Sequence, residues 1–275
     1  MAFKVNQKLS SNLWNQIFIE KINPVRSKLV IENIKKLNKR PIVIGGCGRS
    51  GTTLLASLLG SNKEVFTINS ETALLCPGCY GEEQFPLELN KINKNLRIDK
   101  TKFYNICFDI NLNEEKRWCE MTPRNIYYFE KISNLFKGEV ELVEIVRDGR
   151  DVILSKHSSD KNNFWVNKER WITEVEIGRK LKQKINHHVI KYEDIINDHK
   201  KTLEDLAKKI NIKHLFDWEN WWEKTNLCSD FAFGGKVRPI FNSSVGKWRN
   251  DKTGRVANLM KEKRALELLD ELNYL

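Results

Sequence analysis

The sequence contains no long apolar run. None of its hydrophobic stretches approaches the roughly 18–20 residues that a transmembrane helix needs. Residues 1–25 are polar and include no continuous apolar segment of the kind found in a secretory signal peptide. We therefore expect no membrane span, no export and a cytoplasmic location.

Cysteine and histidine are scarce and show no metal-binding pattern. Six cysteines in a chain without an export signal do not indicate a disulfide framework. Cys76 and Cys79 have the spacing of a zinc or redox pair, but no second such pair accompanies them, and we interpret them as part of an ordinary loop. We expect no metal, and surface or capping roles for four histidines, which are His187, His188, His199 and His214.

A basic tail is also absent, although the chain is strongly basic. The net charge of +11 indicates an anionic partner. Because Lys and Arg are mixed with Asp and Glu throughout and no RNA-binding motif is present, we do not expect that partner to be nucleic acid. The length of 275 residues suits one domain over 1–275, with peripheral helices in 1–40, a core over 41–250 and a C-terminal helix in 251–275.

Glycine is concentrated in one short segment. Residues 41–44 are an apolar, β-branched run that predicts a buried strand, and from Thr52 leucines recur with helical spacing. The glycines between allow the backbone to turn tightly. A strand, a glycine-rich loop and a helix N-terminus form an anion cradle, because unpaired N–H groups and the positive helix end point to one place.

This loop lacks the lysine of an ATP-binding P-loop. Gly46 and Gly51 have the spacing of G-x-x-x-x-G-K-[ST], but Thr52 replaces the lysine and Arg49 is the loop's only cation. The pattern GxxRSGTTLL resembles the 5′-phosphosulfate-binding loop of the sulfotransferase family, whose donor is 3′-phosphoadenosine 5′-phosphosulfate (PAPS). The resemblance implies that the donor is bound by five residues: Arg49, Ser50, Gly51, Thr52 and Thr53.

A second candidate phosphate site follows later in the chain. Residues 139–146 predict a strand, and Arg147 stands at its end. A guanidinium fork from Arg147 and the hydroxyl of Ser155 could converge on one phosphate. The segment VRDGRDVILS resembles the family's 3′-phosphate-binding motif, in which this arginine and this serine are the ligands. The alternative is that Asp148 and Arg150 are only charges at a helix start.

A carboxylate follows the next predicted strand. Residues 64–69 read as that strand, and Glu71 and Thr72 come shortly after it. In the family a glutamate at this place is the general base, and a carboxylate can take the proton of an acceptor hydroxyl as it attacks sulfur. The resemblance implies this role for Glu71, and an exposed loop glutamate is the alternative. The tyrosylprotein branch has an arginine where this chain has Ala73, which weakens peptide tyrosine as the acceptor.

The segment CEMTPRN resembles the family's EKTPxN segment. Thr122 and Pro123 predict the N-cap and first residue of a helix that begins within this region. The family's lysine, which reaches the transferring group, is Met121 here. Arg124 or Arg49 could substitute as the catalytic cation, and the sequence leaves both open.

Two later segments complete the predicted nucleotide site. KYEDI resembles the family's YEDL segment, in which the tyrosine lies near the adenine or the 3′-phosphate, and this implies a donor contact for Tyr192. VRPIFNSSVGKW resembles the basic loop that closes over the nucleotide, which implies contacts from Arg238 and Lys247. Trp248 covers the adenine or anchors this loop, and we favour the anchor.

Hydrophobic spacing predicts the remaining elements. Residues 74–117 lack periodicity, which is typical of a binding lid or substrate wall. We expect a strand over 187–191 and helices over 164–184, 201–210, 217–224 and, at the end of the chain, 255–275.

Strands that alternate with helices predict an α/β fold of three layers, with a central parallel sheet and the ligand at the carboxyl ends of the strands. The resemblance implies the P-loop-like sulfotransferase fold, with features near the tyrosylprotein and bacterial carbohydrate branch. It also implies transfer of a sulfuryl group from PAPS to an acceptor hydroxyl of a carbohydrate, lipid, peptide or small molecule. The alternatives are a P-loop nucleotide-dependent kinase and a non-catalytic protein that binds PAPS or nucleic acid. The acceptor and the oligomeric state stay open.

Overall fold

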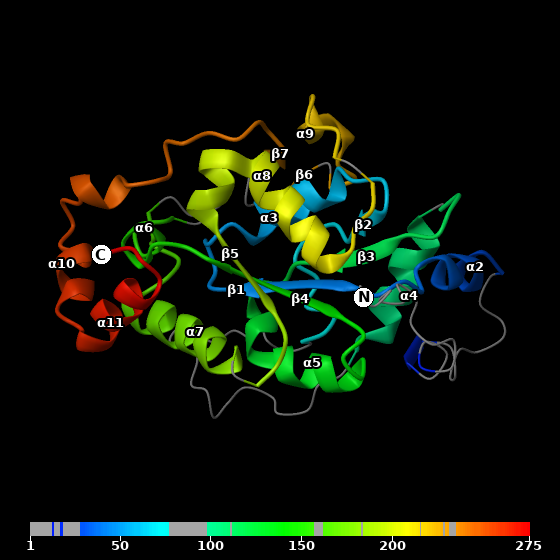
Figure 1. The fold of residues 1–275 in the computed structure, drawn as a ribbon, viewed down its shortest axis with the longest axis horizontal. Coiled ribbons are helices and arrows are strands. Elements are labelled where there is room, and N and C mark those ends of the chain that lie inside the picture. Colours follow the sequence, from blue (N-terminus) through cyan, green and yellow to red (C-terminus); the bar gives the residue numbers. More distant parts are fainter. Residues whose placement is uncertain are drawn as a thin grey trace, which may run out of the picture.

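The computed structural model describes residues 13, 17–18, 28–76, 98–110, 112–156, 162–182, 184–214, 216–227, 229–230 and 235–275. Its centre is a sheet of five strands in the order β2-β3-β1-β4-β5, and each neighbouring pair is parallel (Figure 1). The strands are β1 (Ile42–Gly46), β2 (Val65–Thr67), β3 (Arg117–Glu120), β4 (Glu141–Val146) and β5 (His188–Lys191). The parallel sheet confirms the predicted fold class.

Helices cover both faces of this sheet, which makes the fold three-layered. α3 (Thr52–Gly60) and α8 (Tyr192–Ile210) lie on one face, and α5 (Phe129–Leu135) and α7 (Lys168–Leu181) on the other (Figure 1). No helix in the described residues is long and apolar enough to cross a membrane. The other elements are α2 (Lys28–Lys36), α4 (Lys100–Asp109), η2 (Pro123–Tyr128), α6 (Gly149–Val152), α9 (Trp221–Lys224), β6 (Ser229–Asp230), β7 (Gly235–Lys236), η4 (Lys247–Asn250), α10 (Arg255–Met260) and α11 (Lys263–Glu271).

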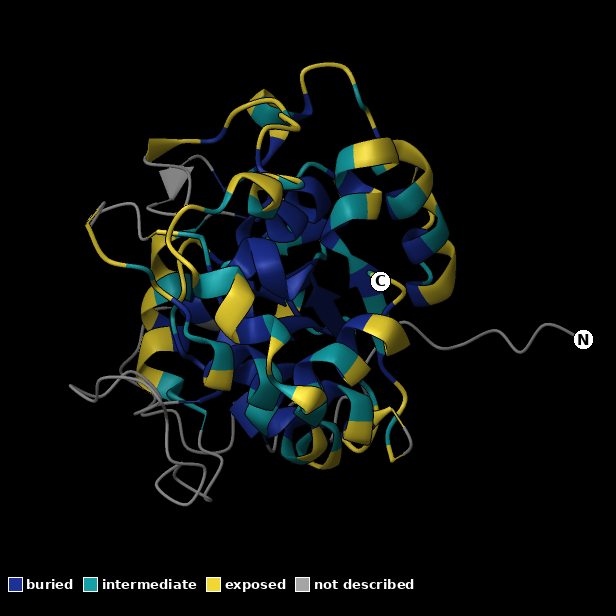
Figure 2. Ribbon diagram, turned by 90° about the vertical axis from the view of Figure 1, so that its left-hand side faces the viewer, coloured by how far each residue is buried: buried dark blue, intermediate teal, exposed yellow. Residues whose placement is uncertain are grey.

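The side chains of the central strands alternate between two hydrophobic clusters. Ile42 and Ile44 of β1 pack with α3 and α8, whereas Val43 packs with α5 on the opposite face. All residues of β1, β3 and β4 are buried, as expected for parallel strands covered on both sides. Viewed from the carboxyl ends of the strands, buried residues form the centre and exposed residues lie on the outer surfaces of the helices (Figure 2).

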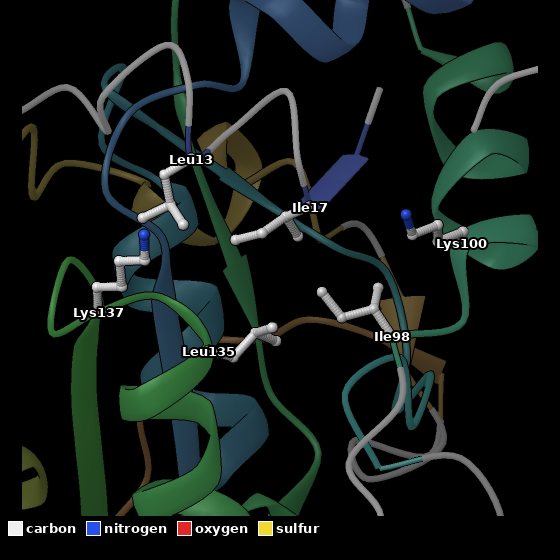
Figure 3. A pocket seen from close by; sticks show the side chains of 6 residues that line it. All are labelled: Leu13, Ile17, Ile98, Lys100, Leu135 and Lys137. Carbon is white, nitrogen blue, oxygen red and sulfur yellow. The ribbon is translucent and has the colours of Figure 1, made fainter. Parts of the chain in front are cut away.

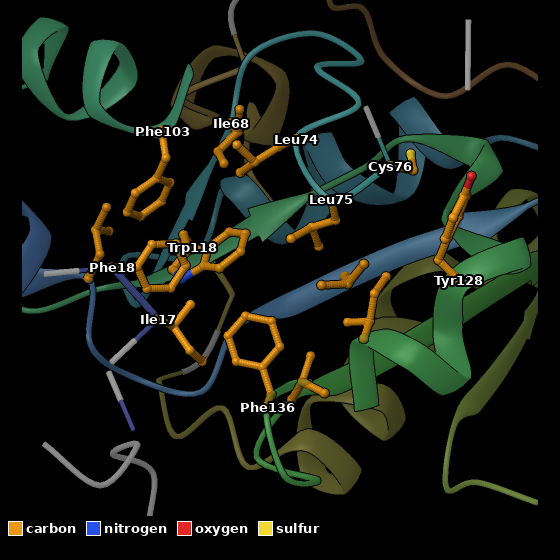
Figure 4. Packing of buried hydrophobic residues seen from close by; sticks show 14 of the residues in the cluster. Ile17, Phe18, Ile68, Leu74, Leu75, Cys76, Phe103, Trp118, Tyr128 and Phe136 are labelled. Atoms are coloured by element: carbon orange, nitrogen blue, oxygen red, sulfur yellow. The ribbon is translucent and has the colours of Figure 1, made fainter. Parts of the chain in front are cut away.

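Aromatic rings fill the cluster on the α5 side. Phe18, Phe103, Trp118 and Phe136 pack together with ring centroids 4.4–6.4 Å apart (Figure 4). Phe18 belongs to the N-terminal stretch predicted to lie outside the core, yet its side chain is fully buried. The described N-terminal residues therefore contribute to the core itself.

Near β3 one prediction is confirmed and another is wrong in part. The helix begins at Pro123 after Thr122, as predicted, although it starts as a 3₁₀ helix, and residues 117–120 form a strand that was not predicted. Residues 98–110 are not irregular, because α4 forms there with the Asp99 side chain accepting a hydrogen bond from the Lys102 N–H at 3.0 Å. Asn and Lys on its exposed side concealed the helical pattern. Residues 77–97, which include Cys79, lie outside the described residues.

The later helices also differ from their predicted bounds. The helix expected over 164–184 is shorter, because the Asn167 side chain caps α7 by accepting from the Arg170 N–H at 2.8 Å. α8 begins at Tyr192 rather than at 201, with a kink at Asp198. Only the last residues of the predicted helix 217–224 are helical, in α9.

The C-terminal region is two helices rather than one. The backbone of Glu262 is extended between α10 and α11, and its carboxylate pairs with Lys168 of α7. His187, expected at the surface, is buried and lies 2.9 Å from a Glu144 carboxylate oxygen.

Candidate active site

The predicted site residues follow the five strands, one group after each. Arg49 follows β1, Glu71 follows β2, Arg124 follows β3, Arg147 follows β4 and Tyr192 begins directly after β5. Because the strands are parallel, these positions share the carboxyl edge of the sheet. The chain leaves β1 towards β2 and leaves β4 towards β5, so its connections diverge between these two central strands. Ligands of α/β proteins bind at such a point.

The loop after β1 turns through left-handed backbone conformations. Arg49 has φ 67° and Gly51 has φ 102°, and the Ser50 N–H closes a turn by donating to the Cys47 carbonyl at 3.1 Å. A Cβ on Gly46 would lie 2.3 Å from the carbonyl oxygen of Ile145 on β4, so only glycine fits there. These features bring the loop against the end of β4.

The N-terminus of α3 has features that suit an anion. Its N-cap, Gly51, provides no side-chain cap, and the first turn carries no acidic residue. Ser50, Thr52 and Thr53 are buried at this end, and in the described part of the chain the Ser50 Oγ has no hydrogen-bond partner. N–H groups at a helix start together with a buried, unpartnered hydroxyl form a phosphate cradle.

Arg147 joins the two predicted phosphate motifs. Its Nη1 donates to the Arg49 carbonyl at 2.9 Å, and its Nη2 donates to the Ser244 carbonyl. The guanidinium lies over the ring of Tyr192, 4.4 Å from the centroid, and the Tyr192 hydroxyl is 2.6 Å from the Ser244 Oγ. Arg147 Nε is buried and has no hydrogen-bond partner among the described residues.

Ser155 occupies a different environment in this structure. Its Oγ donates to the Asp151 carbonyl at 3.0 Å within the turn that follows α6. Among the described residues no hydrogen bond connects it to Arg147. The sharing of one phosphate by Arg147 and Ser155 stays a prediction.

The predicted closing loop is attached to α6. The buried carboxylate of Asp151 accepts from the Gly246 N–H at 2.7 Å and from the Trp248 N–H at 2.9 Å. The Arg150 guanidinium stacks on the Trp248 ring at 3.9 Å, which agrees with the anchor role favoured for this tryptophan. Lys247 and Arg238 are exposed on this loop. The sequence reasoning missed Asp151 and Ser244 as loop contacts, although both lie inside the motifs it identified.

Asp148 and Arg150, next to Arg147, form a buried ion pair. Arg150 Nη2 lies 2.8 Å from an Asp148 carboxylate oxygen, and Arg150 Nε donates to the same carboxylate. Asp148 also caps α6 by accepting from the Arg150 N–H at 2.9 Å. These charges therefore shape the segment after Arg147 and do not only mark a helix start.

Glu71 is exposed on a strained turn. Ser70 and Ala73, on either side, have φ 67° and 50°, in a region that non-glycine residues rarely adopt. The turn is held in place because Thr72 Oγ1 donates to Glu120 at 3.1 Å and the Ala73 N–H donates to Thr122 Oγ1 at 2.9 Å. Strain of this kind persists where the surroundings fix it, often at functional sites.

Glu120 is the buried centre of these contacts. Its carboxylate also accepts from the Thr122 N–H at 3.2 Å and from Asn125, whose amide donates to the Ile44 carbonyl of β1 as well. Burial raises the pKa of this carboxyl, although the hydrogen bonds act in the opposite direction. Met121, in the place of the family's lysine, is buried in the cluster on the α3 side.

Behind the phosphate loop lies an ion pair that the sequence did not reveal. Arg170 Nε donates to Glu174 Oε1 at 3.0 Å, one turn apart on α7, and both side chains are buried. A Cβ on Gly48 would lie 2.8 Å from Arg170 Nη2, so the guanidinium packs directly against the loop. Burial and the nearby Glu174 raise the pKa of Cys47, which is therefore a neutral thiol. Only the i,i+4 spacing on a predicted helix could have indicated this pair.

One pocket lies elsewhere. It has a volume of about 350 Å³ and is lined by Leu13, Ile17, Ile98, Lys100, Leu135 and Lys137 (Figure 3). Leu135 and Lys137 precede β4, so the pocket lies towards the amino end of that strand, whereas Arg147 follows its carboxyl end. Within the described ranges, no three side chains of the metal-binding types are grouped to hold an ion.

Comparisons with known proteins agree with this geometry. Residues 41–217 match the sequence description of the Sulfotransferase family. The sulfotransferase domain of the Synechococcus PCC 7002 olefin synthase is similar in structure, with a TM-score of 0.58, 14% identity and coverage of 86% of this chain and 96% of that one.

Two further solved structures are similar. The sulfotransferase domain of the curacin biosynthetic pathway has a TM-score of 0.55 at 15% identity, covering 86% of this chain and 98% of the other. A sulfotransferase from Alicyclobacillus acidocaldarius has a TM-score of 0.50 at 13% identity, and the match covers 84% of this chain and 96% of that one. No curated protein matches the sequence. Since the family description spans most of the sheet and both phosphate motifs, the chain belongs to the sulfotransferase family.

Proposed function

We propose that this protein transfers the sulfuryl group of PAPS to a hydroxyl group of an acceptor. The observation that carries the proposal is the hydrogen bond of 2.9 Å from Arg147 Nη1 to the Arg49 carbonyl. It places the candidate 5′-phosphosulfate loop and the candidate 3′-phosphate segment next to each other. One doubly phosphorylated adenosine requires two adjacent anion sites of this kind.

The phosphate loop would stabilise the leaving group. The Ser50 N–H already donates to the Cys47 carbonyl. The N–H groups of Arg49, Gly51, Thr52 and Thr53 and the dipole of α3 are fixed before the reaction. They would therefore oppose the negative charge that gathers on the 5′-phosphate as the bond to sulfur breaks. The Ser50 Oγ, for which the described residues provide no hydrogen-bond partner, is available to donate a further hydrogen bond there.

The second motif would hold the other end of the donor. Arg147 and Ser155 are the proposed ligands of the 3′-phosphate, and the Nε of Arg147, which has no hydrogen-bond partner in the described part of the chain, supports this role. Tyr192 would lie beside the nucleotide, and Arg238 and Lys247 would approach it from the closing loop. Binding at both ends orients the sulfur for in-line attack.

Glu71 is the proposed general base, because it follows β2 at the same edge of the sheet and its turn is fixed by Glu120 and Thr122. It would take the proton of the acceptor hydroxyl during attack on sulfur. Arg49 or Arg124 would supply the cation that Met121 cannot. A single domain, a cytoplasmic location and a reaction without metal belong to the same proposal.

Calorimetric titration with adenosine 3′,5′-bisphosphate tests the donor assignment. The wild type should bind it, Arg147→Ala should bind at least tenfold more weakly, and Arg40→Ala should bind like the wild type. Arg40 is a matched control because it lies far from Arg147, at the amino end of β4. There its Nη1 lies 3.5 Å from Glu141 Oε1. Glu71→Gln should keep the affinity and lose transfer of label from isotopically labelled PAPS in a cell extract.

Three results would contradict the proposal. Binding of ATP with Mg²⁺ in preference to the bisphosphate would favour the kinase alternative. Bisphosphate binding without any labelled product would favour the non-catalytic alternative, and a steeply salt-dependent affinity for RNA would favour nucleic-acid binding. The labelled product also identifies the acceptor.

A further inference from the structure

The C-terminal segment returns to the candidate 3′-phosphate site. Tyr274, which follows α11, donates from its hydroxyl to Glu193 Oε2 at 2.7 Å. Its carbonyl accepts from Arg150 Nη2 at 2.6 Å. The C-terminal end of the chain lies beside α6 at the left of the first view (Figure 1). Residues far apart in the sequence thus meet next to Arg147.

Tyr274 reaches Arg147 through two short paths. On the first, Glu193 Oε1 accepts from the N–H of Asp148, the residue after Arg147, at 3.1 Å. On the second, Arg150 holds the Asp148 carboxylate with contacts of 2.8–3.1 Å. Both paths end on Asp148, so Tyr274 closes a ring of hydrogen bonds around the segment that carries Arg147.

This ring fixes the backbone from which the Arg147 side chain extends. The Arg147 carbonyl accepts from Trp171 Nε1 at 3.3 Å, and the next N–H is held by Glu193. Without the Tyr274 hydroxyl, Glu193 loses one of the hydrogen bonds that set its carboxylate plane, and the backbone N–H of Asp148 still donates to it. A guanidinium binds phosphate well only in a defined orientation, because its donors form a rigid fork.

We propose that Tyr274 is a positioning residue for the donor: through Glu193 and Arg150 it orients Arg147 towards the 3′-phosphate. The inference rests on the proposed function. It concerns binding and not the chemical step, so loss of the Tyr274 hydroxyl should raise the KM for PAPS and leave kcat unchanged at saturating PAPS.

Tyr104 provides a matched control. Its hydroxyl donates to the Phe18 carbonyl at 2.8 Å in the cluster on the α5 side, away from Arg147. Tyr274→Phe and Tyr104→Phe therefore each remove one internal hydrogen bond of a tyrosine hydroxyl. If the whole free energy of one lost hydrogen bond appears as weaker binding, the affinity falls roughly fivefold.

The experiment measures the affinity for adenosine 3′,5′-bisphosphate, the stability to urea, and kcat and KM in the full chain. Tyr274→Phe should weaken the affinity about fivefold, whereas Tyr104→Phe should lower stability with an unchanged affinity. In an Arg147→Lys background the effect of Tyr274→Phe should disappear, because the residue that it orients is gone.

Equal effects of both tyrosine variants on affinity would overturn the inference, as would additive effects of Tyr274→Phe and Arg147→Lys. If the wild type binds and Arg147→Lys weakens binding while Tyr274→Phe changes nothing, only this inference fails. If the wild type does not bind the bisphosphate, the proposed function fails and this inference falls with it.

Discussion

The ring of Tyr192 packs against the backbone of Gly51: a Cβ added to Gly51 would lie 2.5 Å from Cδ2 of that ring. Gly51 is the N-cap of α3 and Tyr192 begins α8, so this contact joins the starts of two helices on the same face of the sheet. The same ring lies beneath the Arg147 guanidinium. The phosphate loop can keep its place only while position 51 has no side chain.

Replacement of Gly51 should therefore be severe. In Gly51→Ala the new methyl group meets Tyr192, and φ 102° is unfavourable for alanine, so we expect a loss of about 3 kcal/mol in unfolding free energy and loss of bisphosphate binding. Gly254→Ala is the control, because φ 76° is also positive but no atom lies within 4 Å of the new Cβ. It should cost about 1 kcal/mol and leave binding intact. Urea denaturation and calorimetry measure both, and similar losses in the two variants would contradict the steric explanation.

The charge of Glu174 should contribute more to stability than the charge of Glu176, two residues further along α7. Glu174→Gln removes the charge that compensates buried Arg170, and we expect a loss of about 3 kcal/mol in unfolding free energy together with weaker binding at the phosphate loop. Glu176→Gln, two residues on, removes only pairs with Lys180 and Arg264, which are partly exposed. Its effect should stay below about 0.5 kcal/mol. Thermal denaturation distinguishes them, and equal stabilities would show that Arg170 does not depend on Glu174.

Asp151 should control the closing loop. In Asp151→Asn one of the two carboxylate oxygens that accept from Gly246 and Trp248 becomes an NH₂ donor, which leaves one backbone N–H unsatisfied. We expect bisphosphate binding to be about tenfold weaker, which corresponds to about 1.4 kcal/mol of binding free energy. We also expect faster proteolysis of residues 240–250. Asp198→Asn, which alters a carboxylate that accepts from the Lys201 N–H on α8, should do neither. An intact loop in Asp151→Asn, by limited proteolysis, would refute this.

Glu64 should make the fold sensitive to acid. Burial opposes its ionisation, but hydrogen bonds from the N–H groups of His214 and Lys213 and from the His214 ring outweigh burial and lower the pKa. A carboxyl with a lowered folded-state pKa stabilises the fold above its unfolded pKa of about 4.3, and this stabilisation is lost as pH falls through the folded pKa. Glu64→Gln should lose about 2 kcal/mol at pH 6, and the difference from wild type should shrink towards pH 3. A difference that is constant with pH would exclude this linkage.

The sequence was sufficient for four of the five strands of the central sheet, for local reasons. β1 and β4 are short apolar runs, Gly46 ends β1 and Arg147 directly follows β4, so residue type and position carried the information. β3 was missed because Trp118 and Cys119 adjoin the Thr122-Pro123 helix signal, which outweighed so short a strand.

Contacts between distant segments could not be predicted in this way. The hydrogen bond from Tyr274 to Glu193 and the packing of Arg170 against Gly48 join residues whose partners are set only by the folded topology. No periodicity or spacing along one segment contains that information. The acceptor is a similar case, because residues after Glu71 that could select it belong partly to 77–97.

The hydrogen bond from Arg147 Nη1 reaches the main-chain carbonyl of Arg49. This hydrogen bond between the two candidate phosphate segments consequently does not require a particular amino acid at position 49, provided that the residue tolerates φ 67°. The backbone contact that holds the loop and the chemistry of the side chain at position 49 are thus separable. A substitution at position 49 can therefore alter the side chain there while this main-chain hydrogen bond stays in place.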